Sequence, residues 1–158
     1  MENEKVLKAA KTVYAGICAV LDERGWTYDK DEDKFLIETG VRGDDLAIRI
    51  KIRIDTERQL VILHSPMPFG VPESMRREMA VAVARANHNM VDGCFDYGYE
   101  TGKIVFRLTS SFRGSLISKD VYEYIVSVSC RIIDNYNGKF LTVIDKKMSI
   151  AEINDFIK

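Results

Sequence analysis

The sequence predicts an α+β domain in which helices cover one face of an antiparallel sheet of about five to six strands. Residues 46–54 alternate strictly between apolar and polar side chains, which is typical of a strand with one buried face. Residues 4–23 and 118–136 instead repeat apolar side chains at helical spacing. The other segments complete the order α-β-β-β-β-α-β-β-α-α, and residues 1–158 suit a single domain.

The first helix is expected from Glu4 to about Glu23. Arg24 and Gly25 favour its end, because glycine accepts the left-handed conformation of a helix cap. Two short strands follow, at residues 26–28 and around residues 35–37. The apolar stripe of the helix consists of Val6, Ala9, Ala10, Val13, Ile17, Val20 and Leu21.

The alternating strand and its successor, residues 59–64, are expected to form a hairpin with a three-residue loop. This loop would pair Ile54 with Leu60 and Ile52 with Ile62. The register matters because a slip of one residue exchanges the two faces of the strand. The even-numbered isoleucines are expected to face the helices. The expected register groups other residues on the second face, namely Arg49, Lys51, Arg53, Val61 and Leu63.

A second helix is expected after the loop at residues 65–70, because Pro72 suits the first turn of a helix. It should end at residues 87–89. Its narrow apolar stripe is rich in alanine and methionine, which permits close approach of another surface. We therefore predict a homodimer whose interface contains Met75, Met79, Ala82, Val83 and Ala86.

A second hairpin should join residues 95–99 to residues 104–108 through a turn at Thr101–Gly102. A long helix from Ser118 should then stop at Asn137–Gly138, and Ser149 with Glu152 forms a capping box for a short final helix. The expected cross-strand pairs of the hairpin are Tyr99–Ile104, Tyr97–Phe106, Phe95–Leu108 and Glu100–Lys103.

Charge and composition argue against several kinds of partner. The formal net charge is -1, so no global basic field attracts nucleic acid or an anionic membrane. No apolar run approaches the ~20 residues of a membrane span, and the N-terminus does not resemble a signal peptide. Cys18, Cys94 and Cys130 are far apart and lack metal-binding spacing. We expect reduced thiols and a cytoplasmic location.

The sequence carries no pattern typical of an enzyme, a cofactor site or a metal site. The rival interpretation is a hydrolase that uses Cys94 and His88, but such a nucleophile also needs an orienting acid held in fixed geometry. Residues 29–33 lack the central glycine and terminal glutamate of a calcium loop. We predict no catalytic residue, no metal and no cofactor.

The candidate partner-binding residues combine cations with apolar side chains on one sheet face. They are Arg49, Lys51, Arg53, Val61, Leu63 and Arg107. Such a face suits an acidic peptide or an anion, and it equally suits an ordinary solvated surface. No aromatic residues interleave with the cations, as they would in a site for single-stranded nucleic acid.

Several short motifs lie in the second half of the chain. They are Val71-Pro72-Glu73, Arg85-Ala86-Asn87, Gly93-Cys94-Phe95-Asp96, Ile104-Val105-Phe106-Arg107 and Asp134-Asn135-Tyr136. With the order of elements, they resemble the YbjN-like family of "putative bacterial sensory-transduction regulators", which share the fold of type III secretion chaperones. The resemblance implies a dimer-forming binding protein rather than an enzyme.

The expected function is therefore that of a non-enzymatic, chaperone-like adaptor or regulator that binds a segment of another protein. A small-molecule sensor is the main alternative, and it would need a closed pocket instead of an open face. A purely structural dimer without a ligand is a third interpretation.

Overall fold

The computed structural model describes residues 2–88, 90–115 and 117–158. The helices are α1 (Glu2–Glu23), α2 (Arg76–Asn87), α3 (Lys119–Asp145) and α4 (Ile150–Phe156), with a 3-10 turn at Glu73–Met75. The strands are β1 (Tyr28–Asp31), β2 (Leu36–Arg42), β3 (Ala47–Asp55), β4 (Leu60–Pro66), β5 (Cys94–Gly98) and β6 (Lys103–Ser111). None of the described helices is both long and apolar enough to cross a membrane.

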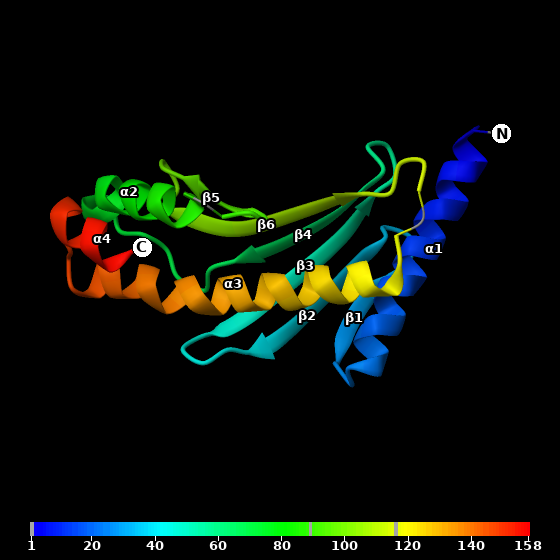
Figure 1. Ribbon diagram of the computed structural model, residues 1–158, viewed down its shortest axis with the longest axis horizontal. Coiled ribbons are helices and arrows are strands. Elements are labelled where there is room, and N and C mark those ends of the chain that lie inside the picture. The colour runs from blue at the N-terminus through cyan, green and yellow to red at the C-terminus, as the bar shows by residue number, and fades with distance from the viewer. Residues whose placement is uncertain (1, 89, 116) are drawn as a thin grey trace.

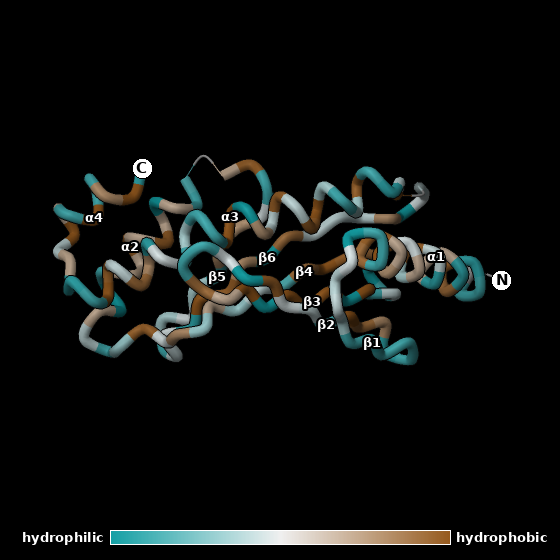
Figure 2. The backbone as a smooth tube through the Cα atoms, turned by 90° about the horizontal axis from the view of Figure 1, so that it is seen from below, coloured by the Kyte–Doolittle hydropathy of each residue, from teal (hydrophilic) through white to brown (hydrophobic). Residues whose placement is uncertain are grey.

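The predicted α+β class and the predicted order of elements are confirmed. The strands form one antiparallel sheet in the order β1-β2-β3-β4-β6-β5. Helix α3 crosses one face of this sheet, and α2 and α4 lie together at its β5 end (Figure 1). Figure 2 shows the strands with α3 along one side, where the apolar segments of both face each other.

The core lies between the helices and the even-numbered residues of β3, as the alternation predicts. Ile50 and Ile52 are each 1% exposed, whereas the arginines and the lysine between the isoleucines are exposed. The buried face of the sheet and the stripes of α1 and α3 belong to one hydrophobic cluster. Burial of these branched side chains is the main stabilising contribution to the fold.

The predicted register of the β3–β4 hairpin is wrong by one residue. Ile54 pairs with Val61 and Asp55 pairs with Leu60, so the loop contains the four residues 56–59. Two local features allow the longer loop. The Asp55 carboxylate accepts a hydrogen bond from the Arg58 backbone N–H, and Gln59 adopts a positive φ of 56°.

The register of the β5–β6 hairpin also differs from the prediction. Phe95 pairs with Phe106, and Gly98 pairs with Lys103, so the expected Glu100–Lys103 pair does not form. The loop therefore contains the four residues 99–102 instead of the expected two, and it is closed by Gly102, which has a φ of 67° and whose N–H donates to the Gly98 carbonyl. This slip is an even number of residues, so each side chain keeps its predicted face.

Helix α3 continues through Asn137–Gly138, where the sequence predicts an end. A glycine inside a helix costs about 1 kcal/mol relative to alanine, which is a modest cost. The helix continues because its next turns bury Phe140 and Val143 completely. The predicted capping box of α4 is present, with Glu152 and Ser149 bonded to each other's backbone N–H groups.

The apolar stripe of α2 is buried inside the chain and is not a surface. Helix α2 packs against α3, α4 and β5, so its stripe contributes to the core of the protein itself. The residues of the predicted dimer interface are therefore buried within the single chain and cannot form that interface. Each is at most 7% exposed: Met75, Met79, Ala82, Val83 and Ala86.

Candidate protein-binding face of the sheet

The sheet has one uncovered face, which we call the open face. It carries the odd-numbered residues of β3, and the neighbouring strands continue the same rows. One row crosses all the strands of the sheet, with acidic residues at the β1 end and basic and uncharged residues from β3 onward. In spatial order they are Asp29, Glu38, Lys51, His64, Arg107 and Cys94.

The predicted cations Arg49, Lys51 and Arg53 all lie exposed on the open face, as the alternation of β3 requires. Lys51 forms an ion pair of 2.6 Å with Glu38 on β2, and Arg53 lies 3.5 Å from the Asp55 carboxylate. The Arg49 side chain makes no hydrogen bond or ion pair with the described residues. Arg49 is therefore the β3 cation that is most available to a partner.

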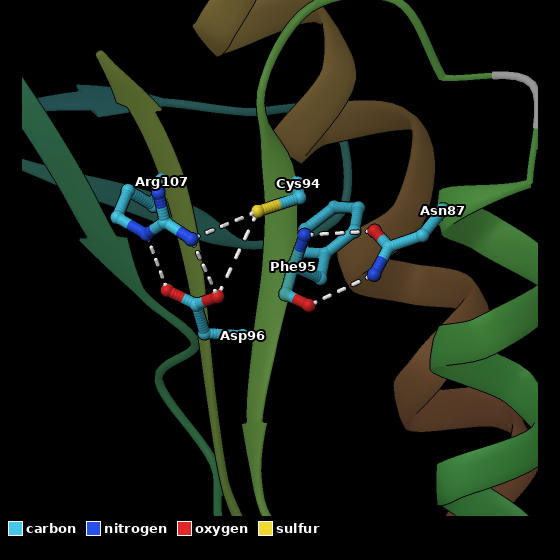
Figure 3. A network of polar contacts seen from close by, with 5 residues as sticks. All are labelled: Asn87, Cys94, Phe95, Asp96 and Arg107. Atoms are coloured by element: carbon cyan, nitrogen blue, oxygen red, sulfur yellow. Dashed lines mark hydrogen bonds and ion pairs between the residues drawn. The ribbon is translucent and has the colours of Figure 1, made fainter.

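Arg107 joins the same face and forms a compact cluster with Asp96 and Cys94 (Figure 3). The guanidinium donates to both carboxylate oxygens of Asp96, at 2.7 and 3.0 Å, and lies 3.4 Å from the Cys94 sulfur. The bidentate hydrogen bonds from Arg107 hold the pKa of Asp96 below its usual value. Asp96 thus remains an anion that partly neutralises Arg107.

The environment of Cys94 does not activate it as a nucleophile. Burial, followed by the Asp96 charge, raises the pKa of the Cys94 thiol, so the thiol stays protonated near neutral pH. The side chain points toward Arg107, away from the side of β5 that faces Asn87 and the end of α2 (Figure 3). His88 is exposed, and none of the described hydrogen bonds joins it to Cys94.

His64 lies at the centre of the row, between Lys51 and Arg107. Its partial burial, and then the Arg107 charge, lower the pKa of the imidazole below 6.5. His64 is therefore neutral at pH 7 and adds a polar but uncharged surface to the centre of the open face.

The apolar part of the open face differs from the predicted one. The one-residue slip in the β3–β4 register turns Val61 and Leu63 to the helix side, where they are 1% and 0% exposed. Leu60 and Ile62 take their place on the open face, and the half-buried Leu36 and Val105 lie on neighbouring strands. In the sequence, Asp55 is the residue that favours the longer β3–β4 loop. Its carboxylate can accept a hydrogen bond from a backbone N–H within the loop, here that of Arg58.

A side chain covers part of the β5 edge of the sheet. At the β5 edge, the Asn87 side chain accepts a hydrogen bond from the Phe95 N–H at 2.8 Å and donates to the Phe95 carbonyl at 3.0 Å (Figure 3). A side chain thereby satisfies groups that a further strand would otherwise pair with. At Phe95, this edge is therefore closed to a further strand.

These features define a class of protein: an α+β fold with a six-stranded antiparallel sheet, one face of which is uncovered and carries both basic and apolar residues. The sequence profile of the YbjN family, described as "Putative bacterial sensory transduction regulator", matches residues 14–141. The chain therefore belongs to the YbjN family. No protein with a curated description matches it.

Several solved structures share the fold, and two of them are described below. One is the crystal structure of YbjN, "a putative transcription regulator from E. coli", with a TM-score of 0.54 and 13% identity over 73% of this chain and 82% of that chain. The other is the ExsC-ExsE complex, with a TM-score of 0.53 and 14% identity over 79% of this chain and 92% of that chain. At these identities the likeness concerns the fold.

Proposed function

We propose that this protein is a non-catalytic adaptor or regulator that binds an extended segment of another protein across its open face. The observation that carries the proposal is the composition of that face. Exposed cations on β3 stand beside half-buried apolar residues, and no helix covers them. The ExsC-ExsE structure supports the proposal, because it is a complex of a protein with this fold.

The chemistry of the face indicates the kind of segment that fits. The half-buried Leu60 offers apolar contact, whereas Ile62 beside it is only 6% exposed, and Arg49 offers a charge that no described residue neutralises. Lys51, Arg53 and Arg107 already have acidic neighbours, so a partner carboxylate would have to compete with Glu38, Asp55 and Asp96. We infer that the bound segment mixes apolar residues with a few acidic ones. The acidic residues would fix the position of the segment along the open face by pairing with its cations.

The test is affinity capture from the native cell lysate, followed by cross-linking of the captured protein to locate the contact. Wild type is compared with Arg49→Glu/Arg53→Glu, which reverses the charge of the face. The matched control is Lys8→Glu/Lys11→Glu, which makes the same charge change at exposed positions on α1. We expect the control to retain the partner, and its cross-links to fall on β3 and β4. Equal capture by all the variants would remove the open face as the site.

The proposal that the protein has no catalytic activity is tested separately. The rival is a hydrolase in which Cys94 is the nucleophile, and the raised pKa of its thiol argues against that role. Screening of wild type and Cys94→Ala against ester, amide and phosphoester substrates distinguishes the two. Reproducible turnover that the substitution abolishes would establish the hydrolase.

A homodimer and a cytoplasmic location remain part of the proposal. The homodimer cannot use the buried stripe of α2, so its interface has to lie on another surface. Light scattering at tens of micromolar measures the mass directly, and a monomeric mass would remove the dimer from the proposal. The free thiols of Cys18, Cys94 and Cys130 suit a reducing compartment.

A further inference from the structure

A cavity lies at the end of the molecule where three segments far apart in sequence converge. These are the first turns of α1, the loop between β3 and β4, and the segment that follows β6, which meet near the N-terminus in Figure 1. The cavity has a volume of about 690 Å³. Its described lining consists of Lys5, Val6, Ala9, Gln59, Phe112, Arg113, Gly114 and Ser115.

The charges of this cavity are one-sided. Lys5 and Arg113 both line it, and no acidic residue is among the described lining residues. Neither cationic side chain makes a hydrogen bond or ion pair with any described residue. This differs from the open face, where Lys51, Arg53 and Arg107 are paired with carboxylates. Lys5 also lies near the N-terminal end of α1, where the helix dipole favours a negative charge.

The rest of the lining is apolar or neutral and polar. Phe112 is 2% exposed, and its backbone N–H is fixed by the Gln59 carbonyl at 3.0 Å, so this part of the wall is rigid. Val6 and Ala9 add the apolar side of α1, while the Gln59 amide and the Ser115 hydroxyl provide neutral polar groups. Ligand sites commonly combine an apolar wall with a few placed polar groups in volumes of about 300–1,000 Å³.

We propose that this cavity binds a small organic anion, with an apolar body against Val6 and Ala9 and a carboxylate or phosphate held by Lys5 and Arg113. The apolar wall favours a ligand with a hydrocarbon or aromatic part over a bare inorganic anion. Two cations in the same lining favour a group with two or more acceptor oxygens. The site is separate from the open face, so this inference does not rest on the proposed function.

The test uses phenyl phosphate as the probe, in an NMR titration of the ¹⁵N-labelled protein. We expect a dissociation constant of about 1 mM or lower. The amide signals of Gln59, Phe112, Gly114 and Ser115 should shift. Inorganic phosphate and phenol carry the two halves of the probe, and each should bind at least tenfold more weakly than phenyl phosphate.

Two double variants separate the cavity from general charge effects. Lys5→Gln/Arg113→Gln should weaken phenyl phosphate binding at least tenfold. Lys8→Gln/Arg58→Gln removes one cation from α1 and one from the β3–β4 loop, both outside the cavity lining, and should bind as wild type does. Melting temperatures verify that both variants are folded. No binding at 10 mM probe, equal binding of inorganic phosphate, or equal loss in both variants would overturn the proposal.

Discussion

Asn87 takes the place of a missing strand at the edge of β5. Its amide bonds both backbone groups of Phe95, the residue that also packs edge-on against Phe106, Tyr136 and Phe140. The sequence predicts that the helix ends at residues 87–89, and α2 does end at Asn87. The bonds of its side chain to the sheet could not be predicted, because they depend on how α2 returns toward β5.

Replacement of Asn87 by alanine should therefore destabilise the protein. Two backbone groups of an edge strand would lose their partners, and we expect the free energy of unfolding to fall by about 1–3 kcal/mol. Asn135→Ala, at an exposed position on α3, is the matched control and should change stability by less than about 0.5 kcal/mol. Urea unfolding measures both. Equal effects of the two substitutions would show that the Phe95 contacts contribute nothing.

His64 should make stability depend on pH in a defined range. Its folded pKa lies below 6.5, so the unfolded chain takes up a proton first as the pH falls. Stability is therefore fully present above 6.5 and is lost as the pH falls through the folded pKa. Around the imidazole, Arg107 and Arg53 oppose the protonated form, and Asp96 partly favours it.

The substitution His64→Gln isolates this effect. Urea midpoints of wild type should decline between about pH 7 and pH 5, and the decline should be smaller in His64→Gln. Asp96 contributes at lower pH, because the pKa of its carboxyl group is already below 3.8. Identical slopes for the two proteins across this range would rule out His64 as the cause.

At the scale of elements, periodicity predicts the existence and type of each strand better than its pairing. The alternation of β3 correctly places Ile48, Ile50 and Ile52 in the core. Pairing depends on loop geometry, which here depends on the positive φ of Gln59 and on the Asp55–Arg58 contact. The same kind of error had a different result in each hairpin, because only an odd slip exchanges faces.

Two glycines inside helices offer a matched test of how the elements pack. A Cβ on Gly16 of α1 would lie 2.6 Å from the ring of Tyr122, which is 5% exposed on α3 and cannot easily move. A Cβ on Gly138 of α3 would have its three nearest contacts with the side chain of Asp45, which is exposed. The first glycine is required by the α1–α3 contact, and the second is required only while Asp45 keeps its position.

We therefore expect opposite outcomes from the same substitution. Gly16→Ala should lower the free energy of unfolding by about 1 kcal/mol or more, since overpacking outweighs the gain in helix propensity. Gly138→Ala in an Asp45→Ala background should raise it by about 0.8–1.0 kcal/mol relative to Asp45→Ala alone. Chemical denaturation of the four proteins, wild type included, decides this. A stabilising Gly16→Ala would mean that α1 and α3 are not in close contact.

At the scale of the whole molecule, the sequence predicts which side of β3 is buried but not which apolar surfaces the chain covers itself. Val61, Leu63 and the stripe of α2 were expected at interfaces with other proteins. All of them belong to the core, because α2 folds back onto α3 and α4 and the β3–β4 register turns Val61 and Leu63 inward. Burial of this kind is a long-range property, so a local pattern of alanine and methionine does not distinguish a protein interface from a core.

Met79 decides between these two interpretations of α2. It is fully buried in the single chain, so Met79→Ala should create a cavity and lower the free energy of unfolding by about 2–5 kcal/mol. The mass of the molecules that remain folded, measured by light scattering, should be unchanged at every concentration. If α2 were instead an intermolecular surface, the substitution would leave monomer stability nearly constant and shift the mass toward that of a single chain. Unfolding and mass measured on the same samples therefore distinguish a core position from an interface position.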